Sequence, residues 1–130
     1  MDGGYLLLDP WYNSSWSYRK QITIDYKKVS GTSDHSNFPM LISTTDADFK
    51  HTNFGGKVAS SSAGITGGGG DFVITSSNGT TKLDHEIEKY ASSSGELITW
   101  GEVPTLSVTA DTILYVYYGG PSSGATNQNP

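Results

Sequence analysis

The stretch from Gly70 to Ala91, GDFVITSSNGTTKLDHEIEKYA, decides the fold class. Two runs rich in β-branched and aromatic residues flank Ser77-Asn78-Gly79, and Asn-Gly between alternating runs is the strongest short hairpin signal because both residues tolerate positive φ. The second run could also form a helix, since Leu83 and Ile87 are four residues apart. The threonines before it, the serine-rich coil after it and the absence of an end cap favour a strand. We therefore predict a β-hairpin with its turn at residues 77–79.

Similar strand patterns lie on both sides of this hairpin. In SYRKQITID (residues 17–25), alternation places one set of residues inside and the other in solvent. Further strands are expected at residues 37–44, where Pro39 restricts the strand to an edge, a start or a bulge, at 95–103, ended by Pro104, and at 111–120. Six or seven short strands joined by turns predict an all-β fold, an antiparallel β-sandwich that is jelly-roll-like. The inner set of the first strand is Tyr18, Lys20, Ile22 and Ile24, and the outer set is Arg19, Gln21, Thr23 and Asp25.

The length of 130 residues suits one domain with one core. We interpret residues 1–10 as a junction segment, residues 11–120 as the β-sandwich domain and residues 121–130 as a linker to a following domain. The Gly- and Ser-rich segment 56–71 is predicted to be a long surface loop.

Composition excludes several classes of protein. Hydrophobic residues make up 35% and charged residues 16% of the chain, and 16 glycines favour an extracellular all-β module. The absence of cysteine excludes disulfides and thiolate metal sites. A formal charge of -5 with eight Lys and Arg residues gives no footprint for nucleic acid. No apolar run approaches the roughly 18 residues of a membrane span, so we expect no membrane insertion.

Several segments in succession resemble the domain-of-unknown-function 2341 family of bacterial surface and secreted proteins. They are WYNSSWSYRKQITI, NFPMLI, DFVITSSNGTTKLDHEIEKY, ITWGEVP and ILYVYYG, within residues 11–119. The resemblance implies a secreted or cell-surface location and covalently linked neighbouring domains, often concanavalin-type lectin modules. It implies no chemistry. The matching positions are Trp16, Arg19, Ile22, Phe38, Pro39, Asp71, Glu86, Trp100, Pro104, Tyr117, Tyr118 and Gly119.

The sequence departs from the family pattern in two places. Gly101-Glu102 stands where the family often has Val-Lys, and a run of glycines precedes Asp71. The shape of the loop before Asp71 is therefore not implied by the resemblance.

Catalytic motifs are weak. His35, His51 and His85 show no metal-ligand spacing, so we interpret them as surface polar residues. No Gly-x-Ser-x-Gly elbow occurs. Three acids, Asp84, Glu86 and Glu88, follow one another on a strand face about 7 Å apart, within the range of glycosidase carboxylates, but like charges in a row are typical of a solvated face. We expect no enzyme.

Two other uses of charged residues are predicted. Arg19 is the only arginine, and a bidentate pair with Glu86 would join two strands. In TTDADF, Asp46 and Asp48 offer carboxylates of the kind that calcium prefers. A structural calcium ion is the one cofactor that the sequence leaves open.

The aromatic residues carry the functional hypothesis. Both faces of DTILYVYY (residues 111–118) are apolar, which predicts a central strand with one face in the core and the other against a covering segment or a ligand. Sugars stack on aromatic rings while polar side chains take their hydroxyls. We therefore predict a noncatalytic carbohydrate-binding module for a cellulose- or xylan-type polysaccharide. Its candidate residues are Trp11, Tyr12, Trp16, Arg19, Gln21, Trp100, Tyr115 and Tyr117.

A structural or adhesive spacer without a sugar ligand is the alternative. A binding module needs two or more rings open to solvent beside a groove, whereas a spacer would bury its rings. Tyr18 is expected in the core and Trp16 at its edge, and Trp100 fits a core or strand-edge position better than a stacking one. Trp11 and Tyr12 precede the strand and are expected to be open to solvent.

Overall fold

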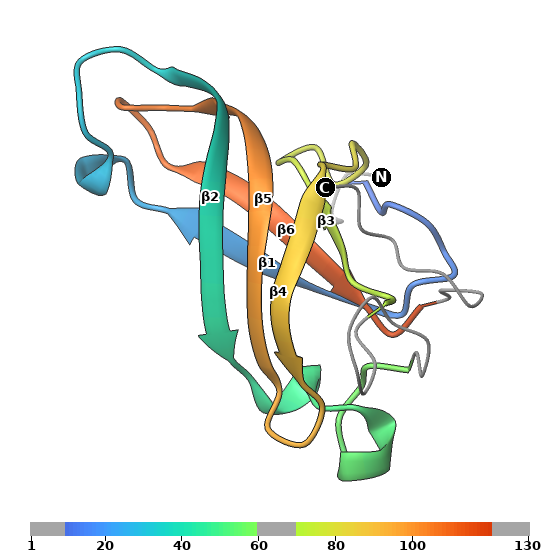
Figure 1. Cartoon of the computed structure of the whole chain (residues 1–130). Coiled ribbons are helices and arrows are strands. Elements are labelled where there is room, and N and C mark those ends of the chain that lie inside the picture. The colour runs from blue at the N-terminus through green and yellow to red at the C-terminus, as the bar shows by residue number, and fades with distance from the viewer. Residues whose placement is uncertain (1–9, 60–69, 121–130) are drawn as a thin grey trace, which may run out of the picture.

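The structure, a computed structural model, describes residues 10–59 and 70–120. The described part forms two packed layers of strands with short 3-10 turns at the sandwich ends (Figure 1). The strands are β1 (Tyr18–Ile24), β2 (His35–Thr45), β3 (Val73–Thr75), β4 (His85–Ala91), β5 (Glu96–Leu106) and β6 (Thr112–Tyr118). The 3-10 helices are η1 (Tyr26–Lys28), η2 (Ala47–Phe49) and η3 (Thr52–Phe54).

Each layer is a three-stranded antiparallel sheet. The β6 sheet has the order β1-β6-β3 and the β5 sheet the order β2-β5-β4. The chain changes sheet at every connection except the β4–β5 hairpin. Alternation between two sheets, with the first and last strands paired, is the jelly-roll pattern, here with fewer strands than the usual eight or so. The predicted all-β, jelly-roll-like sandwich is confirmed.

The predicted turn after β3 is present. The amide of Ser76 donates to the carbonyl of Thr81 (3.0 Å), and Gly79 has a φ of 79°. The two arms do not stay together, however. The amide of Leu83 still donates to the β3 carbonyl of Ile74 (2.8 Å), but the carbonyl of Asp84 accepts from β5. The stretch that decides the fold is thus a turn followed by a change of sheet.

The two strand prolines behave differently from each other. Pro39 lies in β2, an edge strand, as predicted. Pro104 does not end β5, which continues to Leu106. Opposite it in the register lies Asn37, with a φ of 50°, and β4 begins only at His85. Because β2 is the only strand of the described residues that pairs with β5 at this point, Pro104 removes no hydrogen bond that β4 would need.

The main core lies between the sheets. Ile22 and Ile24 of β1 pack against it as predicted, but Tyr18 is 39% exposed and stacks on Tyr118, with 5.5 Å between ring centroids. Tyr18 pairs with Tyr118 across the sheet, so β1 enters and β6 leaves at the same end of the sandwich. The largest buried core residues include Phe72, Ile74, Leu97, Leu106 and Leu114.

Parts of the predicted domain division lie outside the described residues. These are residues 1–9 of the junction, residues 60–69 of the surface loop and the whole linker, 121–130. The described ends of the predicted loop are partly buried, since Val58 and Asp71 have no exposed surface.

Candidate functional site

A second cluster of aromatic residues lies outside the main core, on the outer face of the β6 sheet. Tyr115 and Tyr117 point outward from β6, yet they are only 8% and 0% exposed. Residues 10–17 cover them with Trp16, which is 7% exposed, and with the half-buried Tyr12. Of the two possibilities for this strand face, a covering segment or a ligand, the structure has the covering segment.

Hydrogen bonds fix this covering segment in place. The indole Nε1 of Trp16 donates to the carbonyl of Asp71 (2.6 Å), and that of Trp11 donates to the carbonyl of Trp16 (2.9 Å). The Tyr117 hydroxyl accepts from the amide of Tyr12 (3.0 Å) and donates to the carbonyl of Gly79 (2.7 Å). The polar atoms of these aromatic residues are therefore engaged within the protein.

Arg19 completes the aromatic cluster. Its guanidinium carbon lies 4.7 Å from the ring centroid of Trp11 and 4.3 Å from that of Tyr115. Its Nη1 donates to the carbonyl of Pro10 and to the hydroxyl of Tyr117, both at 3.0 Å. The predicted pair with Glu86 is wrong, because Arg19 and the exposed Glu86 lie on the outer faces of opposite sheets. Cation–π contacts, which alternation alone does not reveal, take the place of that ion pair.

Seven of the predicted sugar-binding residues therefore share one face, but they pack mainly on one another. Trp11 is the ring that remains open, at 40% exposure, and Tyr12 is half-buried rather than open. Gln21 is exposed, and its amide donates to the hydroxyl of Thr23 (3.2 Å). On this face the described residues do not provide two open rings beside a groove.

The outer face of the β5 sheet is different, because it is not covered by any described segment. Across its middle run Leu41 of β2, Trp100 of β5 and Glu86 of β4, which are direct register partners. Leu41 is 45% and Trp100 is 37% exposed, so the prediction that Trp100 serves the core or an edge is wrong. Its indole Nε1 donates to Oε1 of Glu88 (3.0 Å), which orients the ring.

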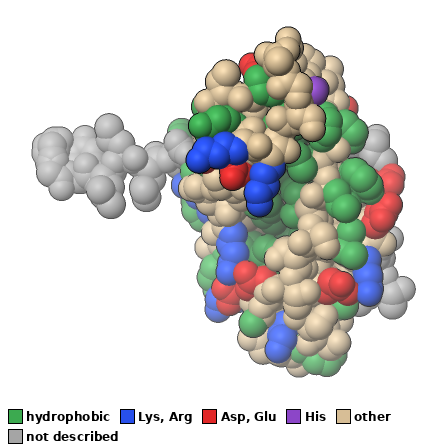
Figure 2. Space-filling view, turned by 90° about the vertical axis from the view of Figure 1, so that its left-hand side faces the viewer, with side chains coloured by type: hydrophobic (Ala, Val, Ile, Leu, Met, Phe, Trp, Pro, Cys, Tyr) green, Lys and Arg blue, Asp and Glu red, His purple; other side chains and the backbone are tan. Residues whose placement is uncertain are grey.

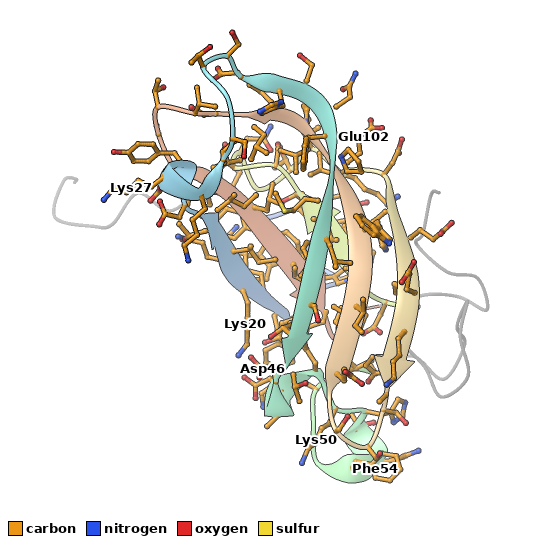
Figure 3. All side chains as sticks on the ribbon, turned by 60° about the vertical axis from the view of Figure 1, so that its left-hand side comes forward. Lys20, Lys27, Asp46, Lys50, Phe54 and Glu102 are labelled. Carbon is orange, nitrogen blue, oxygen red and sulfur yellow. The ribbon has the colours of Figure 1, made fainter. Side chains whose placement is uncertain are left out.

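A shallow hollow of about 190 Å³ adjoins the Trp100 ring. Acidic residues of neighbouring strands line it, with Asp84 and Glu86 on one side and Glu102 on the other. Figure 3 shows Glu102 pointing outward from this sheet. Carboxylates accept hydrogen bonds only, so the hollow offers acceptors beside an apolar ring. We call Leu41, Glu86, Glu88, Trp100 and Glu102 the Trp100 face.

The predicted calcium ligands are engaged by a lysine. Lys20 Nζ lies 2.7 Å from Oδ2 of Asp46 and 3.0 Å from Oδ2 of Asp48. These hydrogen bonds raise the pKa of Lys20 above its usual range, and the bond from Lys20 lowers the pKa of Asp46. Within residues 10–59 and 70–120 no group of three or more His, Cys, Asp or Glu side chains could hold a metal ion. Calcium binding therefore stays a prediction that these two carboxylates alone would carry.

Two of the three histidines are not surface residues, contrary to the prediction. His85 is 2% exposed, and among the described residues no side chain or backbone group lies in hydrogen-bonding geometry with its ring nitrogens. Burial, followed by the charge of Lys82, lowers its pKa to about 4. His51 is 7% exposed and its Nδ1 accepts from the amide of Asn53 (3.1 Å). Alternation could have placed His85 inside, because it is in phase with the buried Leu83 and Ile87.

No helix of the described residues is both long and apolar enough to cross a membrane. In comparisons with known proteins, no protein-family model, no curated protein and no solved structure matches the chain. The likeness to the domain-of-unknown-function 2341 family stays a prediction from the sequence segments.

Proposed function

We propose that the chain is a noncatalytic carbohydrate-binding module that holds a polysaccharide on the Trp100 face. The observation that carries the proposal is the exposed Trp100 ring, oriented by Glu88 at 3.0 Å and placed beside an acid-lined hollow. The sequence predicted a site whose residues lie mainly on the covered outer face of the β6 sheet. The site that we propose lies on the open outer face of the β5 sheet.

The chemistry follows from the groups on this face. The apolar face of a sugar ring would stack on Trp100, while its hydroxyls would donate to Glu86 and Glu102. A ring held in one orientation loses little rotamer freedom when it binds, which favours stacking. With one open ring, the face would hold one sugar unit at a time, so affinity for each site would be weak.

A spacer domain is the second candidate, and the burial of Trp16, Tyr115 and Tyr117 favours it. The sandwich geometry counts against it. The pairing of Tyr18 with Tyr118 places the first and last strands side by side with their connections at one end, and such a domain adds little length to a chain. The domain would project to one side of the parent chain, with the outer faces of its sheets exposed. This arrangement suits a binding module in a larger secreted or surface protein.

Depletion by insoluble polysaccharides tests the proposal. The chain is mixed with cellulose, xylan, mannan and chitin, the solids are spun down, and both the remaining protein and any released reducing sugar are measured. We expect depletion by at least one polysaccharide, which Trp100→Ala abolishes. Phe54→Ala is the matched control, because Phe54 is also exposed (53%) but lies in η3, away from the Trp100 face.

Three results would count against the proposal. Depletion that persists in Trp100→Ala would place binding elsewhere, and no depletion on any of the solids would favour the spacer. Released sugar would require an enzyme.

A further inference from the structure

The side of the sandwich between β1 and β2 is open. A hollow of about 500 Å³ runs along it, lined by every residue from Lys20 to Ile24 and from Met40 to Thr44. Ile22 and Ile42 line it, so part of the core is reached from this side. Figure 2 shows this side of the molecule, with hydrophobic side chains in the hollow between charged groups above and below it. We call this hollow the β1–β2 groove.

The groove continues past the middle of β2. An adjoining hollow of about 360 Å³ is lined by Val29, Phe38 and Leu106, and Ile24 and Met40 line both hollows. Together they form one long apolar channel that follows the two strands. Apolar channels of this extent on a protein surface mark sites for a partner.

The strands that border the β1–β2 groove favour one kind of occupant. β1 and β2 are edge strands, and within the described residues each pairs with a strand on one side only. Consecutive residues line the hollow, so backbone edges flank it as well as side chains. An aliphatic floor between strand edges suits an extended peptide, which can use main-chain hydrogen bonds and place alternate side chains in pockets. Two phenylalanines line the hollows, Phe49 of η2 and Phe38 of β2, but Phe49 is buried and Phe38 is half-buried, so neither offers an open ring to a sugar.

Charges at the two ends of the groove differ. At one end Lys20 faces both Asp46 and Asp48, which leaves one negative charge in excess. At the other end Lys28 and Asp25 line the hollow, Lys27 of η1 lies next to them, and Asp111 accepts from the η1 amide of Tyr26 (3.1 Å). Figure 3 shows Lys27 near one end of this side and Lys20 with Asp46 near the other. A bound strand with an acidic residue at one end and a basic residue at the other could pair with Lys28 and with Asp48, respectively.

We propose that the β1–β2 groove binds an extended strand of a partner polypeptide, with alternating aliphatic side chains, an acidic residue at the Lys28 end and a basic residue at the Asp48 end. This site differs from the one proposed for polysaccharide, the Trp100 face on the outside of the β5 sheet, and Leu41 borders both.

The test uses a synthetic peptide that alternates Val and Thr, with Glu at one end and Lys at the other. Binding to the full chain is followed by amide NMR shifts and by slowed hydrogen exchange along β1 and β2. A peptide with Pro at alternate positions is the negative control, because it cannot pair with a strand edge. We expect saturable binding of the first peptide only.

Two lysine substitutions, one inside the groove and one outside it, provide matched variants. Met40→Lys places a charge in the groove, and we expect affinity to fall about tenfold or more. Phe54→Lys adds the same charge in η3, at a residue that is 53% exposed and lines neither hollow, and should leave affinity unchanged. Lys28→Glu should weaken binding, and a peptide with Lys in place of its Glu should restore it. Equal effects of Met40→Lys and Phe54→Lys, or no rescue by the changed peptide, would overturn the proposal.

Other occupants would give different results. If the peptide binds only after residues 1–9 are deleted, the N-terminal segment of the chain itself fills the groove. Dimerisation that Met40→Lys abolishes would show that a second copy fills it. Either result would overturn the proposal of a separate partner. Full-length chain that shows no binding to the peptide, without either of these effects, would also overturn it.

Discussion

The guanidinium of Arg19 lies between the rings of Trp11 and Tyr115, 4.7 and 4.3 Å from their centroids. The same group donates to the carbonyl of Pro10 at 3.0 Å. Arg19 thus joins the covering segment to the β6 sheet by flat stacking and by directed hydrogen bonds, and lysine can reproduce only part of this.

We expect Arg19→Lys to lower the free energy of unfolding by about 1 to 2 kcal/mol. Urea denaturation followed by tryptophan fluorescence measures it. Gln21→Ala, the next outward position on β1, is the control and should change stability by less than about 0.5 kcal/mol. Equal effects of the two changes would show that the stacking contributes nothing.

Truncation of Trp16 and of Trp100 should lower the stability of the protein by different amounts, because one side chain is buried and the other is exposed. Trp16 is 7% exposed and donates to the carbonyl of Asp71, whereas Trp100 is 37% exposed. Trp16→Ala should cost about 3 to 5 kcal/mol, because it leaves a cavity in the aromatic cluster. Trp100→Ala should cost less than about 1 kcal/mol, because its ring faces solvent. Thermal unfolding of both variants checks this, and a larger loss in Trp100→Ala would contradict the assignment of the two faces.

Acid should destabilise the sandwich through His85. Its pKa falls from 6.5 to about 4 on folding, because burial, and then the charge of Lys82, disfavour the imidazolium. The unfolded chain therefore binds the proton first, so stability is full above about pH 6.5 and declines as the pH falls toward 4. The free energy of unfolding should fall by on the order of 3 kcal/mol over this pH range.

The variant His85→Leu isolates this effect. It removes the titrating group at a buried position opposite Gly101, so the decline between about pH 6.5 and 4 should shrink. Urea midpoints at several pH values measure it. The same decline in His85→Leu and in the native chain would mean that other groups cause it.

The effect of calcium on stability tests the role of Asp46 and Asp48. Since the ammonium of Lys20 already occupies the space between Asp46 and Asp48, millimolar calcium should leave the unfolding midpoint of the native chain unchanged. In Lys20→Met the two carboxylates lose their cation, and calcium should raise the midpoint. Calorimetry with and without calcium, with magnesium as control, checks both. A calcium-dependent rise in the native chain would support a resident ion instead.

Alternation along the strands predicted much of the fold and less of the site. It placed Arg19 and Gln21 on one face of β1 and Ile22 and Ile24 on the other, as observed. It could not show that residues 10–17 fold back over β6, because that depends on contacts between residues far apart in the sequence. The bond from Trp16 to Asp71 spans 55 residues.

The same limit explains the misplacement of Trp100. The sequence shows that Trp100 is out of phase with the buried Leu97, Thr99 and Val103, but it does not show which sheet face remains uncovered. Whether an outward ring is open depends on the segment packed over it. For Tyr117 that segment is present, and for Trp100 no described residue supplies one.

Alanine substitutions at two glycines of similar backbone conformation distinguish the cost of a steric clash from the cost of a left-handed backbone. Gly95, in the β4–β5 turn, has a φ of 80°, and a side-chain carbon there would overlap with the carbonyl of Asp46. Gly55 has a φ of 86°, with nothing within 4 Å of such a carbon. Gly55→Ala should cost about 1 to 2 kcal/mol for the left-handed backbone alone. Gly95→Ala should cost about 3 kcal/mol or more, because the hairpin must also move away from η2. Chemical denaturation of both variants measures the difference, and equal losses would show that the turn does not pack against Asp46 in solution.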